Sequence, residues 1–263
     1  MYTVYPIFKT GGENSMKQWN GEEFVNEWHG YHMDEGRFMG QPYVVICPKE
    51  GTANGQWALK TEYFGAFPQL ELDLLARGYH LAHVKTYERY CPPPVTELQA
   101  CFVDFVSGRY GLSPKCVPIG MSCGGLQAIY LAGKHPDKVA CAYIDAPVVN
   151  FLSVPFCMGK RNASNAIEEF ENAWGINRQE ILTFRGHPLD YIPNMITNRI
   201  PVVLVCGDSD TVVPFEENGK LLLDAYKAAG CPIECHMKPG GDHHPHCLPD
   251  NAPIVAFIEK YTL

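Results

Sequence analysis

The chain has 263 residues, of which 46% are hydrophobic and 19% are charged, and its formal net charge is −8 at pH 7. This is an ordinary globular composition with enough apolar material for a sizeable core, and the length suits one large α/β domain. The acidic balance and the lack of a Lys/Arg run exclude an electrostatic footprint for nucleic acid. No apolar run approaches the roughly 18 residues that a membrane span needs, so no membrane partner is expected.

The 11 cysteines indicate the redox environment. Their number is odd, and they fall in expected strands and helices, which is typical of reduced core thiols and not of a disulfide framework. The first residues, Met1 to Pro6, lack the basic segment followed by an apolar segment that marks an export signal. We therefore expect a cytoplasmic protein.

Apolar runs alternate with helical patterns along most of the chain. Within residues 1–40, only 22–37 is compatible with a hairpin or edge strands. Further along, strands are predicted at 43–47, 79–84, 139–144, 201–206 and 233–237, and helices at 68–76, 95–110, 126–135, 215–229 and 252–261. Strands that alternate with helices of 10–15 residues predict an α/β fold with a mostly parallel sheet and helices on both faces.

The alternation stops between residues 148 and 199. This stretch is rich in aromatic residues and has helical patterning around 163–174. Because it lies between two strands near the carboxyl edge of the sheet, we interpret it as a small helical cap inserted into a single domain that spans 1–263. A long crossover is the alternative. The aromatic side chains of a cap would favour an aromatic or sugar-linked acyl substrate.

The stretch from Val117 to Gly125 reads VPIGMSCGG, an apolar run that enters a G-x-S-x-G sequence. The residues that follow, 126–131, have the pattern of a buried helix face. The expected structure is strand, sharp turn and helix, with Ser122 at the apex. Gly120 and Gly124 remove side chains that would clash in this strained turn, and the start of the helix favours developing negative charge. Ser122 is therefore the candidate nucleophile.

A serine hydroxyl is a weak nucleophile until a histidine accepts its proton and an acid orients that histidine. On sheets of this kind the chain order is serine, acid, histidine. Downstream of Ser122, the apolar run 202–206 ends at Gly207, and Asp210 falls in the loop that follows. Asp208 is nearer to the strand, where an Asx-type turn bond is the simpler role. Asp145, at the end of an earlier strand, is a second alternative orienter.

The candidate bases lie in the stretch 239–246, PGGDHHPH, after the last core strand. This tract also admits a metal-site interpretation, with the following ligands: Asp242, His243, His244, His246 and Cys247. Adjacent histidine side chains diverge, however, and no second ligand cluster with metal spacing is evident. We therefore predict neither a metal nor a cofactor.

Taken together, these motifs resemble those of the α/β-hydrolase superfamily. Residues 207–214 match its G-x-x-D-x-x-V-P pattern and the histidine loop matches its G-H-x-P-H pattern, in the expected order after the serine. The resemblance spans residues 43 to 263 and is closest to bacterial prolyl-oligopeptidase-like and acyl-esterase serine hydrolases. It implies an α/β-hydrolase fold and the triad Ser122, Asp210 and His243. Asp242 stands where the family usually has glycine, which leaves His244 as the alternative base.

An oxyanion hole needs two donors directed at the developing negative charge. One is expected to be the backbone N–H of Cys123, directly after the nucleophile. The other is expected from the loop after the strand 43–47, with Lys49 and, further along, Trp57 as candidates. Trp57, Tyr63, Phe64 and Phe67 are candidates to line a substrate pocket, although aromatic clusters are as often plain core.

The combined hypothesis is a cofactor-independent serine esterase acting on a small-molecule ester through an acyl-enzyme intermediate. Ester is preferred to amide because the chain carries no β-propeller of the kind that gates peptides in large oligopeptidases. A peptidase or amidase of the prolyl-oligopeptidase-like type is the alternative within enzymes. A catalytically silent binding protein on the same fold is the alternative of another class. The sequence makes no prediction of the oligomeric state.

Overall fold

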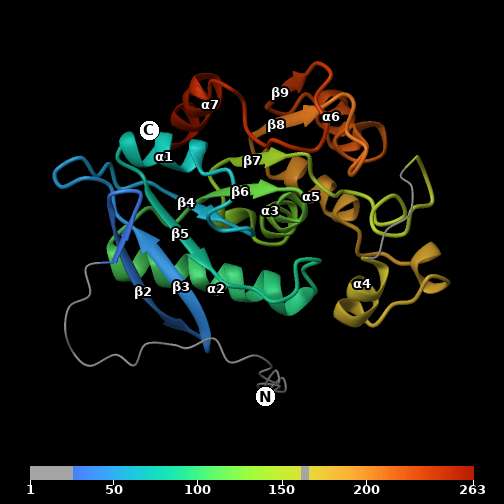
Figure 1. The fold of residues 1–263 in the computed structure, drawn as a ribbon, viewed down its shortest axis with the longest axis horizontal. Helices are drawn as coiled ribbons and strands as arrows, with labels where there is room; N and C mark the ends of the chain where they lie inside the picture. Colours follow the sequence, from blue (N-terminus) through green and yellow to red (C-terminus); the bar gives the residue numbers. More distant parts are fainter. Residues whose placement is uncertain (1–25, 161–165) are drawn as a thin grey trace.

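A computed structural model describes residues 26–160 and 166–263. Part of the expected N-terminal hairpin, 22–25, and the first residues of the expected cap helix, 163–165, lie outside the described residues. Within the described part, strands pair into a nine-stranded sheet of order β1-β2-β3-β5-β4-β6-β7-β8-β9 (Figure 1). The strands are β1 (Asn26–Trp28), β2 (Tyr31–Phe38), β3 (Gln41–Ile46), β4 (Trp57–Lys60), β5 (His80–Val84), β6 (Val117–Met121), β7 (Ala142–Asp145), β8 (Val202–Gly207) and β9 (Ile233–Lys238).

The sheet has two parts of different polarity. Strands β1, β2, β3 and β5 pair antiparallel, whereas β5, β4, β6, β7, β8 and β9 all run parallel to their neighbours. Every residue of β6, β7 and β8 is buried. That burial explains their near-continuous apolar sequences, because parallel strands are covered on both faces. The predicted mostly parallel sheet is therefore confirmed.

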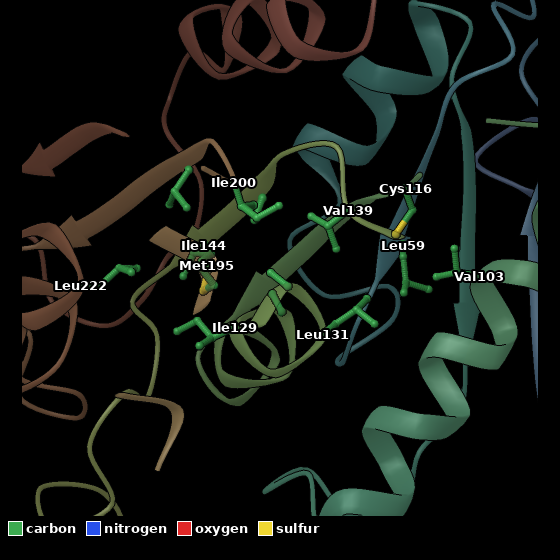
Figure 2. Close-up of a cluster of buried hydrophobic side chains, with 14 of the residues drawn as sticks. Leu59, Val103, Cys116, Ile129, Leu131, Val139, Ile144, Met195, Ile200 and Leu222 are labelled. Atoms are coloured by element: carbon green, nitrogen blue, oxygen red, sulfur yellow. The ribbon is translucent and has the colours of Figure 1, made fainter. Parts of the chain in front are cut away.

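Helices cover the two faces of the sheet. They are α1 (Gln69–Ala76), α2 (Pro93–Tyr110), α3 (Cys123–Lys134), α4 (Ile167–Trp174), α5 (Ile192–Thr197), α6 (Gly219–Ala228) and α7 (Ala252–Thr262). Helices α2, α3, α5 and α6 contribute to one core layer, and Figure 2 shows Val103, Ile129 and Leu222 from three of them pointing into it. Helices α1 and α7 pack on the opposite face. Among the described residues, no helix is long and apolar enough to cross a membrane.

Residues 148–199 connect β7 to β8 and carry α4, α5 and two short 3-10 helices, η2 (Glu180–Leu182) and η3 (Pro188–Tyr191). Figure 1 places α4 beyond the carboxyl ends of the central strands. Three aromatic side chains of the segment, Phe151, Phe156 and Phe170, are 0% exposed and pack on one another. The same core includes Cys123, Leu126 and Tyr130, so these three rings serve packing, and the expected aromatic or sugar-linked acyl substrate stays a prediction.

Candidate active site

Ser122 occupies the turn between β6 and α3, as its sequence pattern predicts. Its backbone has φ 54° and ψ −118°, a conformation that is strained for a residue with a side chain. The turn is closed so tightly that a Cβ at Gly120 would lie 2.3 Å from the Gly124 carbonyl oxygen. The Ser122 N–H donates to the Asp145 carbonyl at 2.9 Å, which ties the turn to the end of β7.

Asp210 and His243 meet Ser122 at the carboxyl edge of the sheet. The His243 Nδ1 lies 2.8 Å from Asp210 Oδ2, and its Nε2 lies 3.1 Å from Ser122 Oγ. Both His243 and Asp210 are buried, while Ser122 is partly exposed. A serine hydroxyl, an imidazole and a carboxylate thus form one hydrogen-bonded chain, in which the carboxylate selects the tautomer that leaves Nε2 free to accept a proton.

The carboxylate of Asp210 is held in place by its own loop. Its second oxygen, Oδ1, accepts the N–H groups of Val212 at 2.8 Å and Val213 at 2.7 Å. These bonds orient Oδ2 toward His243. Asp210 is therefore an acceptor prepared for an imidazole N–H.

Two further aspartates join the acid loop to the histidine loop. Asp242 accepts the N–H of Thr211 at 2.9 Å and of His243 at 2.8 Å, and these bonds hold the pKa of its carboxyl below the usual range. Asp208 accepts the N–H of Gly240 at 2.7 Å. Asp242, where the family usually has glycine, therefore fixes the position of the histidine loop. In this register His243, and not His244, reaches Ser122.

Asp145 belongs to a second histidine–aspartate pair. It is 0% exposed and accepts hydrogen bonds from His246 Nδ1 at 2.9 Å, the Cys247 N–H at 2.7 Å and the Tyr143 hydroxyl at 2.7 Å. Burial opposes its ionisation, but the bond from His246 and the nearby positive charges outweigh that effect and lower its pKa. Asp145 thus anchors the end of the histidine loop, and among the contacts of residues 26–160 and 166–263 none joins its carboxylate to His243.

Two of the predicted oxyanion residues lie far from the site. Strand β3 runs antiparallel to β5, so its end, and the loop with Lys49, lie at the opposite edge of the sheet from Ser122. The Lys49 ammonium there bonds the Gly30 carbonyl and covers the Tyr31 ring. Trp57 begins β4 at that same edge, is 1% exposed and donates its indole N–H to the Ser113 carbonyl at 2.9 Å. Both assignments are wrong.

The segment that lies beside Ser122 is instead the loop after β4, and the sequence analysis did not place this loop there. Strand β4 is a parallel neighbour of β6, so its carboxyl end adjoins the turn. Thr61 Oγ1 donates to the Gly124 carbonyl at 2.8 Å, and the Tyr63 hydroxyl lies near the Cys123 thiol and Arg89. Burial raises the pKa of the Tyr63 phenol, so it stays protonated, and raises the pKa of the Cys123 thiol to about 11.

The histidine loop also borders open space. A cavity of about 570 Å³ is lined by Phe67, Lys238, His244 and His246, among others. Of the aromatic residues expected to line a pocket, Phe67 lies here and stacks on His244 at a centroid distance of 5.4 Å. The rings of His243, His244 and His246 surround one point, with centroids 4.7, 5.0 and 4.9 Å apart. The adjacent histidine side chains therefore converge, contrary to the sequence-based expectation.

Solved structures with the same fold include a hydrolase and two dipeptidyl peptidases by their names. A puromycin hydrolase variant is 16% identical with a TM-score of 0.64, over 82% of this chain and 36% of its own. The dipeptidyl peptidase 4 of Porphyromonas gingivalis (12% identical, TM-score 0.63) and a putative dipeptidyl aminopeptidase IV of Bacteroides ovatus (12% identical, TM-score 0.61) each match over 88% of this chain and 35% of theirs. The chain thus spans about a third of the length of these proteins.

A model of a known protein family matches most of this sequence. The model of the prolyl oligopeptidase family covers residues 86–261, about two thirds of the chain, and includes all three residues of the hydrogen-bonded chain. This match agrees with the resemblance drawn from the serine turn, the acid loop and the histidine loop, and it favours the peptidase alternative over the esterase. The chain belongs to the prolyl oligopeptidase family.

Proposed function

We propose that the protein is a serine hydrolase that cleaves amide bonds of short peptides or aminoacyl compounds. The observation that carries the proposal is the continuous chain from Ser122 Oγ through His243 to Asp210, with contacts of 3.1 and 2.8 Å. Family membership and the peptidase names of two structural neighbours support an amide substrate over the ester expected from the sequence.

Each residue has a role that follows from its position. Ser122 Oγ attacks the substrate carbonyl carbon while His243 Nε2 takes the hydroxyl proton, and Asp210 stabilises the imidazolium through Nδ1–H. The tetrahedral intermediate collapses when His243 returns that proton to the leaving amine. Water then attacks the acyl-enzyme with His243 again as base, which releases the acid and restores Ser122.

The oxyanion is proposed to receive two donors from neighbouring elements. The first is the Cys123 N–H, at the start of α3, where helix N–H groups have no intrahelical acceptor. The second is the Tyr63 hydroxyl, which lies against Cys123 and is kept protonated by burial. This pair replaces Lys49 and Trp57. The Cys123 thiol is unsuited to be the nucleophile, because its pKa of about 11 leaves it neutral at working pH.

The test is hydrolysis of aminoacyl-p-nitroanilides, p-nitrophenyl esters and feruloyl esters by the wild type and Ser122→Ala. We expect anilide turnover that falls at least about 10³-fold in Ser122→Ala. Ser209→Ala is the matched control, since this serine is exposed and its hydroxyl bonds only Asp208 among the described contacts. It should keep wild-type rates. Turnover confined to the esters would contradict the amide proposal, and activity that survives Ser122→Ala would remove the serine mechanism.

A further inference from the structure

The convergence of three imidazoles is not needed for serine chemistry. Each of His243, His244 and His246 offers one ring nitrogen, and these three atoms all lie within 4.8 Å of one another. Three histidine nitrogens this close together are a typical ligand set for a borderline divalent ion such as Zn²⁺. A serine hydrolase requires only one of them, so the other two call for a separate explanation.

Buried carboxylates orient two of these rings. His243 Nδ1 is held by Asp210 at 2.8 Å, and His246 Nδ1 is held by Asp145 at 2.9 Å. Each bond leaves Nε2 as the available nitrogen. Carboxylate–histidine–metal arrangements of this kind fix the tautomer and raise the basicity of ligating histidines in metalloproteins. The two rings are therefore prepared in the way that metal sites prepare their ligands.

The third ring is adjustable. His244 is exposed and stacks on Phe67, and no hydrogen bond joins it to Ser122 or Asp210 among the contacts of the described residues. Around a tetrahedral ion with Zn–N of 2.0–2.1 Å the nitrogens stand about 3.4 Å apart. The three nitrogens now lie within 4.8 Å of one another, so the rings must move somewhat closer, and the exposed His244 is less confined by packing than the buried His243 and His246.

We propose that His243, His244 and His246 bind Zn²⁺ or a similar divalent transition ion, and that the bound ion inhibits the enzyme reversibly. The ion would occupy the Nε2 lone pair of His243, which must accept the proton of Ser122. Ser122 Oγ now lies 3.1 Å from that nitrogen, so a bound ion would displace this hydrogen bond. The binding half of this proposal stands on geometry alone, whereas the inhibition half rests on the proposed function.

Binding is tested without activity, on the full chain carrying Ser122→Ala. Equilibrium dialysis against Zn²⁺ should give a site whose affinity falls about 100-fold when His244→Ala is added, because loss of a ligand costs at least as much as loss of an outer-shell partner. His135→Ala is the control, since this histidine bonds Glu97 away from the loop, and it should bind Zn²⁺ unchanged. Zn²⁺ binding that is the same with and without His244 would place the ion elsewhere, for example on a thiol, and would overturn the proposal.

Inhibition is tested on the active protein. Wild-type hydrolysis should fall as Zn²⁺ is added and recover with chelator, whereas Mg²⁺, which prefers oxygen ligands, should have no effect. With each protein normalised to its own rate without Zn²⁺, His244→Ala should need about 100-fold more Zn²⁺ for half inhibition than the wild type. Wild-type activity that Zn²⁺ does not reduce at concentrations that fill the site would refute the inhibition. A chain that binds Zn²⁺ yet hydrolyses no substrate would refute the proposed function and leave the metal site standing.

Discussion

Asp210→Asn isolates the electrostatic role of the acid from its structural role. The asparagine carbonyl can still accept the N–H groups of Val212 and Val213, which now bond Oδ1 at 2.8 and 2.7 Å. Its NH₂ group then faces His243 Nδ1, where Asp210 Oδ2 stood at 2.8 Å. An amide donor selects the opposite imidazole tautomer, in which Nε2 carries the hydrogen and cannot accept the serine proton.

The expected effect is large on rate and small on stability. A wrong tautomer lowers kcat by about 10⁴ in serine enzymes with this arrangement, which corresponds to roughly 5.4 kcal/mol of lost transition-state stabilisation. Unfolding free energy should change by no more than about 1–2 kcal/mol, because both backbone donors keep an acceptor. Asp210→Ala removes that acceptor as well, so it should reduce stability more than Asp210→Asn does.

The assay is kcat/KM on the best p-nitroanilide together with urea unfolding of each variant. Asp208→Asn is the matched control, because it makes the same substitution on an exposed neighbour that bonds only Ser209 and the Gly240 N–H among the described contacts. We expect it to stay within about threefold of the wild type. A loss below about tenfold in Asp210→Asn would refute the reasoning, since the imidazole would then be oriented by another group.

Three other predictions concern separate parts of the molecule. Tyr63→Phe should lower kcat by about 10² with little change in KM, as loss of one oxyanion donor does; an unchanged kcat would exclude the phenol. Burial lowers the pKa of His83 below 6.5 in the folded protein. As the pH falls below 6.5, the unfolded chain therefore binds more protons than the folded one. The free energy of unfolding should then decrease by up to about 1.4 kcal/mol per pH unit. Urea unfolding at several pH values should find this slope reduced in His83→Gln. Phe170→Leu should lower the unfolding free energy by about 1–3 kcal/mol and leave KM unchanged, whereas a raised KM would mean that substrate reaches this ring.

The central strands and their helices were predictable because their signals are local. The runs at 202–206 and 142–144 are apolar throughout and lie between helical patterns, as buried parallel strands do. The serine turn could be placed to the residue, since glycine at 120 and 124 is what the close packing of that turn requires. Asp210 and His243 followed from chain order and motif, and the structure brings them together with Ser122.

The segment that carries the proposed oxyanion donor Tyr63 could not be found in the same way. Strand β4 is only four residues, Trp57–Lys60, too short for a periodic signal, and it ends in a lysine that is typical of a surface position. Lys60 is instead 1% exposed and forms a buried ion pair with Glu71. Because this strand was not predicted, the position of the loop carrying Tyr63 relative to the sheet could not be predicted either.

The direction of a strand was the second feature that the sequence did not reveal. An apolar run indicates that a strand exists but not which way it runs, and β3 is antiparallel to β5. Its following loop, with Lys49, was therefore assigned to the wrong edge of the sheet. The choice between His243 and His244 is similar, because adjacent residues share every local pattern. Only the path of the loop, held by Asp242 and Asp208, separates them.

Asp145 connects the turn that carries Ser122 to the loop that carries His243. Its carbonyl accepts the Ser122 N–H at 2.9 Å, and its carboxylate holds His246 and the Cys247 N–H. Ser122 and the loop that carries His243 are thus both hydrogen-bonded to a single residue at the end of β7. If the end of β7 moves, Ser122 and the histidine loop are expected to move with it. The distance between Ser122 and His243 is then less sensitive to motions of the sheet.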